Sequence, residues 1–269
     1  MDTRQDKDPG ARSGGSAPGW LLAIDTSTER LAVALDGPGG GWFVEAAGGA
    51  EASRSLLPQS QALLRQAGLD WAELSAVAFG RGPGAFTGLR TSCAVAQGLA
   101  CGLGCVVLPV DSLLIVAEDA RQAAGERGPF DIGVVMDARM GEAYAARYRF
   151  TPGAAGDVAA AGWQASEPPC LCDPGPLRER WALQPPQCIA GSGLLAFGSL
   201  PWASLGSALQ EQEVSRARAL ARLARSAFDA GAGLDPALAL PIYLRDKVAL
   251  TTAERAQRAA AAAVQGGPA

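Results

Sequence analysis

The stretch LLAIDTSTERLAVAL, residues 21–35, sets the first unit of the fold. Two apolar runs of strand length flank Asp25-Thr26-Ser27-Thr28, and short polar side chains of this kind favour a tight turn. The pattern predicts two antiparallel strands with Asp25 at the end of the first. A Gly/Pro-rich turn at residues 37–41 and an apolar run at 42–46 extend the pair to a three-stranded meander.

A similar pattern occurs in the second half of the chain, in VMDARMGEAYAARY at residues 135–148. A buried strand again ends in an aspartate, Asp137, and a short polar turn leads into a second strand. This weak internal repeat predicts two related domains. The expected division is a disordered tail at residues 1–19, domains at 20–114 and 115–250, and a C-terminal helix or tail at 251–269.

Alternating helix and strand patterns fill the rest of the chain and favour an α/β architecture. Ser55 resembles an N-cap, Pro58 would lie in the first turn, and Gly68 would end that helix. The stretch 151–187 is rich in Ala, Gly and Pro, which indicates loops or an insertion. The expected helices cover residues 55–67, 87–103, 111–120, 213–228 and 254–264, and the further strands cover 74–79, 106–110, 131–136 and 142–148.

Composition excludes several classes of function. The 269 residues contain no histidine, so Ser-His-Asp and Cys-His catalysis and His-ligated metal sites are absent. The net charge of −4 argues against a generally basic nucleic-acid binder. No CxxC pair occurs among six cysteines, and Cys93, Cys101 and Cys105 resemble small buried apolar residues. Without a signal-like or membrane-length apolar run, a cytoplasmic location is expected.

The two aspartates suggest a phosphate cleft. An Asp at a strand end, followed by hydroxyl residues, can hold a magnesium-bound water and donate to phosphate oxygens. The alternative is an Asx or ST turn that only shapes the hairpin. A phosphotransferase of the actin/sugar-kinase type needs two such hairpins facing each other across a cleft. Gly191-Ser192-Gly193 either approaches a nucleotide base in that cleft or forms a simple turn.

The glycine-rich stretch GRGPGAFTGLR, residues 80–90, follows a strand and opens a helix. Backbone N–H groups in such a loop can bind an anion. Pro83 removes one donor, however, and no Gly-Lys-Ser/Thr sequence occurs, so dinucleotide and P-loop functions are rejected. A structural turn is the simpler interpretation.

The helix after this loop carries small residues on one face. Thr91, Val95, Gly98 and Gly102 follow at spacings of four, three and four. Each glycine weakens an isolated helix by about 1 kcal/mol, so tight packing has to compensate. The face packs either on the chain's own sheet or on a partner helix, with the opposite strip serving the sheet. That opposite strip consists of Leu89, Cys93, Ala96 and Leu103.

Two C-terminal segments complete the candidates. Arg218, Arg222 and Arg225 share one helix face, which is either a solvated surface or a contact for RNA or an acidic partner. PIYLRDK at residues 241–247 contains Pro and Tyr, which indicates an ordered, docked segment.

These motifs together resemble the TsaB (YeaZ) family, the non-catalytic subunit of the bacterial machinery that makes threonylcarbamoyladenosine at adenosine 37 of tRNA. The resemblance covers about residues 20–250. GPGAFTGLR carries it most specifically, and DARMGEAY and PIYLR support it. The motif-loop residues are Gly82, Pro83, Gly84, Phe86, Thr87, Gly88 and Arg90.

The resemblance implies an actin-like ATPase (ASKHA) fold of two ribonuclease-H-like domains. It implies a TsaD-type catalytic partner bound through the two helices at 55–67 and 87–103, and a TsaE-type ATPase in the same cycle. It also implies indirect contact with tRNA and no membrane. Homodimers through the same two helices are implied when the partner is absent. The expected interface residues are Leu57, Leu64, Thr91, Val95, Gly98 and Gly102. Asp25, Thr26, Ser27, Asp137, Gly191 and Gly193 would be remnants of a nucleotide cleft, with no cofactor or metal expected and weak ATP or ADP binding left as an alternative.

The sequence departs from the family pattern at two positions. Arg54-Ser55 stands where the family has His-Ser, and Ala85 replaces the serine of GPGSFTG. The absence of histidine excludes the metal-binding catalytic paralogue. The alternative function is an ATP-dependent phosphotransferase of the actin/sugar-kinase type that uses Asp25 and Asp137. Such an enzyme needs a further catalytic carboxylate, and none can be identified.

Overall fold

The computed structural model describes residues 19–38, 40–153 and 162–245. The first half forms a five-stranded sheet in the order β3-β2-β1-β4-β5, with β1, β2 and β3 antiparallel and β4 and β5 parallel to β1. The meander predicted from residues 21–46 is therefore present. The strands are β1 (Trp20–Asp25), β2 (Arg30–Gly37), β3 (Gly40–Ala47), β4 (Leu74–Gly82) and β5 (Val106–Asp111).

The second half forms a sheet with the same plan. Its order is β8-β7-β6-β9-β10, again an antiparallel meander followed by two strands parallel to its first strand. The internal repeat detected around the two aspartates is thus a repeat of topology. The strands are β6 (Phe130–Asp137), β7 (Ala143–Thr151), β8 (Gly162–Cys172), β9 (Cys188–Ala190) and β10 (Ala208–Gln210).

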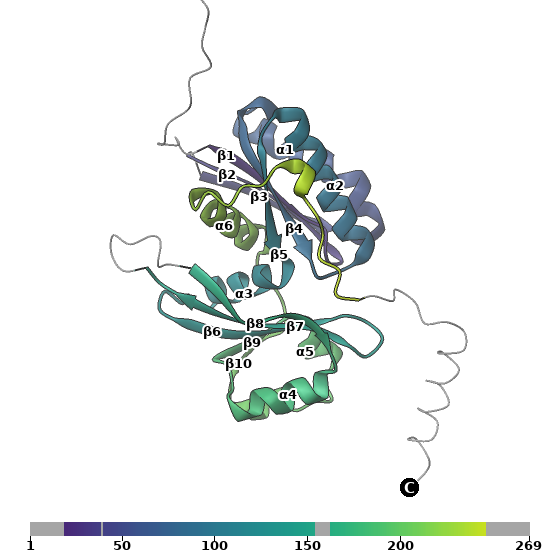
Figure 1. The fold of residues 1–269 in the computed structure, drawn as a ribbon, viewed down its shortest axis with the longest axis vertical. Helices are drawn as coiled ribbons and strands as arrows, with labels where there is room; N and C mark the ends of the chain where they lie inside the picture. The colour runs from purple at the N-terminus through teal and green to yellow at the C-terminus, as the bar shows by residue number, and fades with distance from the viewer. Residues whose placement is uncertain (1–18, 39, 154–161, 246–269) are drawn as a thin grey trace, which may run out of the picture.

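Helices cover both faces of each sheet (Figure 1). α1 and α2 bury an apolar strip on the outer face of the first sheet, and α4 and α5 cover the outer face of the second. α6 and α3 pack against each other between the two sheets. The helices are α1 (Ala52–Ala67), α2 (Phe86–Leu103), α3 (Ser112–Ala123), α4 (Pro174–Leu183), α5 (Gly193–Ala196) and α6 (Arg216–Asp229).

The chain returns to its first half after completing the second sheet. α6 begins at the N-cap Ser215, whose hydroxyl accepts the Arg218 N–H, and it packs on β1 and β2. The segment after α6 then pairs with β5 at Leu234 and follows α2, where Ala239 is buried against Cys93. α6 therefore packs on the first sheet, although the expected division at residues 114 and 115 assigns it to the second domain.

Two predictions about local structure are wrong. α1 begins at Ala52, because a 3₁₀ turn at Gly49–Glu51 runs directly into it, so Ser55 and Pro58 lie inside the helix. Residues 151–187 contain β8 and α4 rather than loops alone. β8 is an edge strand, which tolerates the two prolines and the polar residues that obscured it.

The other predicted helices and strands agree with the structure to within a few residues at their ends. The tail at 1–18 and the helix at 254–264 lie outside the described residues. None of the helices in the described ranges combines the length and the apolar character needed to span a bilayer.

Candidate functional site

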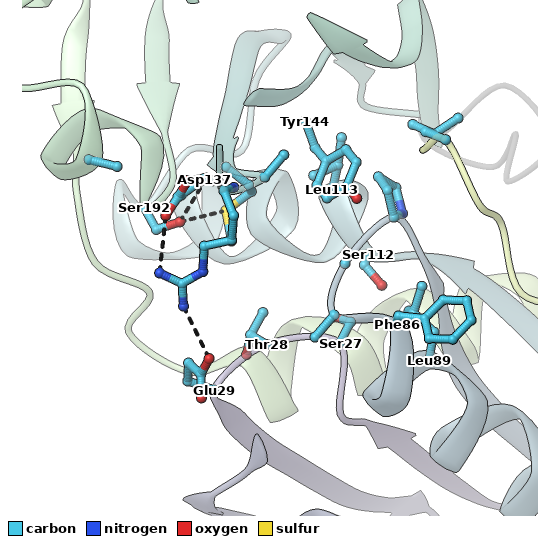
Figure 2. Close-up of a pocket in the computed structure, with 18 of the residues that line it drawn as sticks. Ser27, Thr28, Glu29, Phe86, Leu89, Ser112, Leu113, Asp137, Tyr144 and Ser192 are labelled. Carbon is cyan, nitrogen blue, oxygen red and sulfur yellow. Dashed lines mark hydrogen bonds and ion pairs between the residues drawn. The ribbon is translucent and has the colours of Figure 1, made fainter. Parts of the chain in front are cut away.

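A cleft of about 710 Å³ lies between the two sheets, at the ends of β1 and β6 (Figure 2). The turn after β1 contributes Ser27, Thr28 and Glu29, and the turn after β6 contributes Asp137 and Arg139. The two Asp-bearing hairpins thus face each other as predicted. Apolar side chains fill much of the remaining wall, including Phe86, Leu89, Leu113, Met136, Tyr144 and Ile242.

Asp25 does not line this cleft, because it is fully buried and held by an arginine. Nε of Arg216, in the first turn of α6, lies 2.5 Å from Oδ2 of Asp25. The same guanidinium donates to Ser27 Oγ at 2.9 Å and to Glu213 at 2.7 Å. Burial alone lowers the pKa of Arg216, but Asp25 and Glu213 outweigh it and raise that pKa, so the guanidinium stays charged.

The glycine-rich motif holds the Asp25 turn in place. The backbone of Gly84 and Gly88 lies directly against the carbonyl oxygens of Ser27 and Thr26. Thr26 Oγ1 donates to the Gly88 carbonyl at 2.7 Å, and Ala85 N–H donates to the Ser27 carbonyl at 2.8 Å. These glycines are required for close packing of the start of α2 on the turn, which supports the structural interpretation of the motif.

Gly88→Ala is therefore expected to lower the free energy of unfolding by about 3 kcal/mol, because the new methyl group would overlap the Thr26 carbonyl oxygen. Gly98→Ala is the matched control on the same helix, since a Cβ there meets nothing within 4 Å. It should stabilise the chain by about 0.5–1 kcal/mol. Chemical denaturation of both variants measures the difference. Equal effects at the two positions would contradict this account of the motif.

Asp137 shapes its own turn and lies at the cleft. Its Oδ1 accepts the Arg139 N–H at 2.7 Å, and its own N–H donates to Ser192 Oγ at 3.2 Å. Arg139 also reaches across the cleft to Glu29 at 3.2 Å, which links the two hairpins (Figure 2). Both side chains of that bridge are mostly exposed, so it contributes little to stability.

Of the six residues expected at a nucleotide cleft, Ser27 and Asp137 line it and the other four do not. Asp25 and Thr26 are buried beneath the turn. Gly191 and Gly193 pack against the Val135 backbone, while Ser192 between them faces the cleft. The packing of the two glycines fits the turn interpretation, and Ser192 is the residue of this motif that lines the cleft.

The C-terminal segment crosses the mouth of the cleft. Ile242 N–H donates to the Arg81 carbonyl at 2.6 Å in the first half, and Arg245 binds Glu142 at 2.6 Å in the second. The Tyr243 ring packs on Phe86, and its hydroxyl accepts from Arg90 Nε at 3.1 Å. Residues 241–245 are thus docked as predicted.

α2 presents two different faces. Leu89, Cys93 and Ala96 are buried and Leu103 packs on the same core, so this strip serves the sheet as predicted. On the opposite strip, Gly98 and Gly102 are exposed and Thr91 is half-buried, whereas Val95 is half-buried and also packs against the core. A Cβ at Gly98 or Gly102 would meet open space. The packing that should compensate for these glycines does not come from the described part of the chain.

Of the two α1 leucines predicted at the interface, one is exposed and the other is buried. Leu57 is 43% exposed, whereas Leu64 is 2% exposed and belongs to the core. After Gly68 the chain reverses, and Leu69 donates to the Leu64 carbonyl at 2.9 Å and packs on the same core. Leu64 is therefore not an interface residue, and that prediction is wrong.

The cysteines and acidic side chains of the described residues were candidates for a further reactive centre. Cys93 is buried, Cys105 is half-buried and Cys101 is exposed, so the expectation of three buried cysteines is wrong for Cys101. Burial raises the pKa of the Cys188 thiol to about 11 and that of Cys172 to about 12, so neither is a thiolate at neutral pH. Within the described ranges, no group of three His, Cys, Asp or Glu side chains could hold a metal ion.

The doubled sheet order and the cleft between the sheets define an actin-like ATPase-type fold. A family model described as TsaD, tRNA N6-adenosine threonylcarbamoyltransferase, matches residues 46–165. The Escherichia coli tRNA threonylcarbamoyladenosine biosynthesis protein TsaB is 32% identical, over 85% of this chain and 96% of its own length. The chain belongs to the TsaB family, also called YeaZ.

Solved structures agree with this assignment. The structure of YeaZ from Pseudomonas aeruginosa is 33% identical and covers 84% of this chain and all of its own, with a TM-score of 0.68. A second Pseudomonas aeruginosa structure, described as similar to the peptidase YEAZ, is 32% identical over the same shares, with a TM-score of 0.71. The Haemophilus influenzae TsaB is 37% identical over 46% of this chain and 51% of its own length.

No sequence pattern predicted the role of Arg216. The other arginines of α6 attracted attention through their spacing, whereas Arg216 stands alone beside the N-cap. Its role depends on α6 folding back over β1, which no local pattern reveals. Arg245 and Tyr243 lay within a segment predicted to dock, but their partners were not predictable.

Proposed function

We propose that this chain is a non-catalytic subunit in the biosynthesis of tRNA threonylcarbamoyladenosine. On this proposal it binds a TsaD-type catalytic subunit through the outer surface of α1 and α2, and it acts in the same cycle as a TsaE-type ATPase. Family membership supports the pathway. The single observation that supports a scaffold role is the open strip of small residues on α2, whose glycines lack compensating packing in the described chain.

Small residues on a helix allow another backbone to approach closely, and that is the geometry of a helix–helix contact. Leu57 supplies an exposed apolar side chain on α1, the helix that packs next to α2. The same surface would serve a homodimer when the catalytic partner is absent. Thr91, Val95, Gly98, Gly102 and Leu57 are the proposed contact residues.

The state of Asp25 disfavours the phosphotransferase alternative. A magnesium-dependent phosphotransferase needs a carboxylate that can reach a metal-bound water in the cleft. The Asp25 carboxylate instead binds a buried guanidinium, and Asp137 holds its own turn. Neither of the two aspartates that this alternative uses is therefore free to hold a metal-bound water in the cleft.

An omission assay tests the proposed function. tRNA threonylcarbamoylation is reconstituted from the cognate TsaD-type and TsaE-type proteins, the threonylcarbamoyl-adenylate synthase, ATP, threonine, bicarbonate and tRNA. The modified nucleoside should form only when this chain is present, and the chain alone should form none. Unchanged product without the chain would contradict the proposal, and ATP-dependent phosphorylation of small metabolites by the isolated chain would revive the alternative.

A further inference from the structure

A second hollow, of about 430 Å³, lies on the side of the first sheet opposite α1 and α2. Residues from α6, α3, β2 and β3 line it. Four of its eight lining residues are arginines and only one is acidic. The lining residues are Asp36, Phe43, Arg121, Gln122, Arg218, Ala221, Arg222 and Arg225.

The arginines differ in how fully the chain neutralises them. Arg121 is buried and forms a bidentate pair with Glu118 at 2.7 and 2.9 Å. Arg222 shares that same carboxylate at 3.1 Å, although its side chain is 63% exposed. A single buried carboxylate thus serves two guanidinium groups.

Of the remaining two arginines, Arg225 forms an ion pair and Arg218 forms none within the described part of the chain, so the hollow carries excess positive charge. Arg225 pairs with Asp36 at 2.9 Å, with Asp229 further away at 3.7 Å. Arg218 is exposed, forms no ion pair with any described carboxylate, and lies over the Phe43 ring at 4.3 Å. Against four positive charges stand Glu118, Asp36 and the more distant Asp229, so at least one positive charge is in excess.

We propose that this four-arginine hollow binds the phosphate backbone of an RNA. Arginine presents planar N–H groups that match phosphate oxygens, and the N–H groups of exposed Arg218 and Arg222 can donate to an incoming strand. The Arg218–Phe43 stack adds the planar cationic and aromatic surface on which unpaired bases pack. This favours RNA over an acidic peptide, which has no bases to stack.

The position of the hollow separates it from the proposed partner surface. α1 and α2 cover one face of the first sheet, and α6 covers the other. An RNA strand on α6 and a protein partner on α1 and α2 would therefore bind at the same time. The RNA contact goes beyond the scaffold role, and direct binding to the isolated chain tests it separately.

The test uses the full chain and a fluorescently labelled, unmodified tRNA transcript. Arg218→Ala/Arg222→Ala is the test variant, and Arg127→Ala/Arg149→Ala is the control, since it removes the same charge from exposed arginines elsewhere. Glu118 keeps Arg121, Gln122 and the Trp163 indole as donors, so the test variant should fold. Thermal unfolding checks that both variants are folded.

The test variant should bind tRNA about tenfold more weakly, and its dependence of log K on log salt should be shallower by about 1.4–1.8 for two lost phosphate contacts. The control should change affinity less than about twofold. Equal losses in both variants, or unchanged binding in the test variant, would overturn the proposal. Displacement of tRNA by polyglutamate at equal charge concentration would also overturn it and assign the hollow to an acidic peptide.

The two proposals fail in different ways. If modification needs the chain but the test variant binds tRNA normally, only the RNA contact is wrong. If the chain is dispensable in the omission assay while tRNA binding still depends on Arg218 and Arg222, only the scaffold role is wrong.

Discussion

Gly98→Arg is expected to abolish association with the TsaD-type subunit while the chain stays folded. Gly98 is exposed on the outer strip of α2, where an added side chain meets nothing in the described chain. In a close helix–helix contact, however, a long charged side chain would hold the partner backbone away and bury an unpaired charge. We expect affinity to fall at least about a hundredfold, which corresponds to about 2.7 kcal/mol.

Isothermal titration calorimetry with the purified TsaD-type subunit measures this loss, and the reconstituted modification assay should lose product in parallel. Gly128→Arg is the matched control, because Gly128 also faces open space but lies between α3 and β6, far along the chain from the strip. It should bind the partner as the original chain does. Normal binding by Gly98→Arg would show that the contact lies elsewhere.

Arg216→Met is expected to lower the free energy of unfolding by about 3–5 kcal/mol. The side chains of Arg216 and Asp25 are 1% and 0% exposed, so removing the cation leaves a buried carboxylate without a counter-ion. The hydrogen bond from Arg216 to Ser27 is lost as well. Methionine keeps much of the side-chain volume, so the effect reports on charge more than on a cavity.

Urea denaturation at neutral pH gives the value, and the double variant Asp25→Asn/Arg216→Met provides the control. An amide at residue 25 removes the stranded charge, so the double variant should regain part of the lost stability. A single variant that loses less than about 1 kcal/mol would contradict the role assigned to this pair. A double variant that is less stable than the single variant, as expected if the two changes acted independently, would also contradict that role.

Local patterns predicted the elements of the fold well. Residues 21–35 and 135–148 each revealed a strand pair ending in aspartate, and those two pairs begin both sheets. Periodic patterns did not predict β8, because its residues are only partly buried or exposed. β8 is an edge strand with two prolines, so neither alternation nor propensity distinguishes it from a loop.

The site was harder to predict because its determinants are distant in the sequence. The two facing hairpins were predicted from the repeat, but the buried ion pair of Asp25 is made with Arg216, 191 positions away. Leu57 and Leu64 look equivalent in a helical repeat, yet the chain reversal after Gly68 buries only the second. Such long-range contacts depend on the tertiary fold and leave no periodic signal.

The return of α6 to the first sheet has a consequence for synthesis on the ribosome. Leu21, Ala23 and Ala32 are buried beneath Leu220 and Ala224, which follow them by about 190–200 residues. Until α6 emerges, the first sheet exposes one apolar face, and Asp25 lacks its counter-ion. The N-terminal half therefore cannot complete its folding as an early, independent unit before α6 has been made.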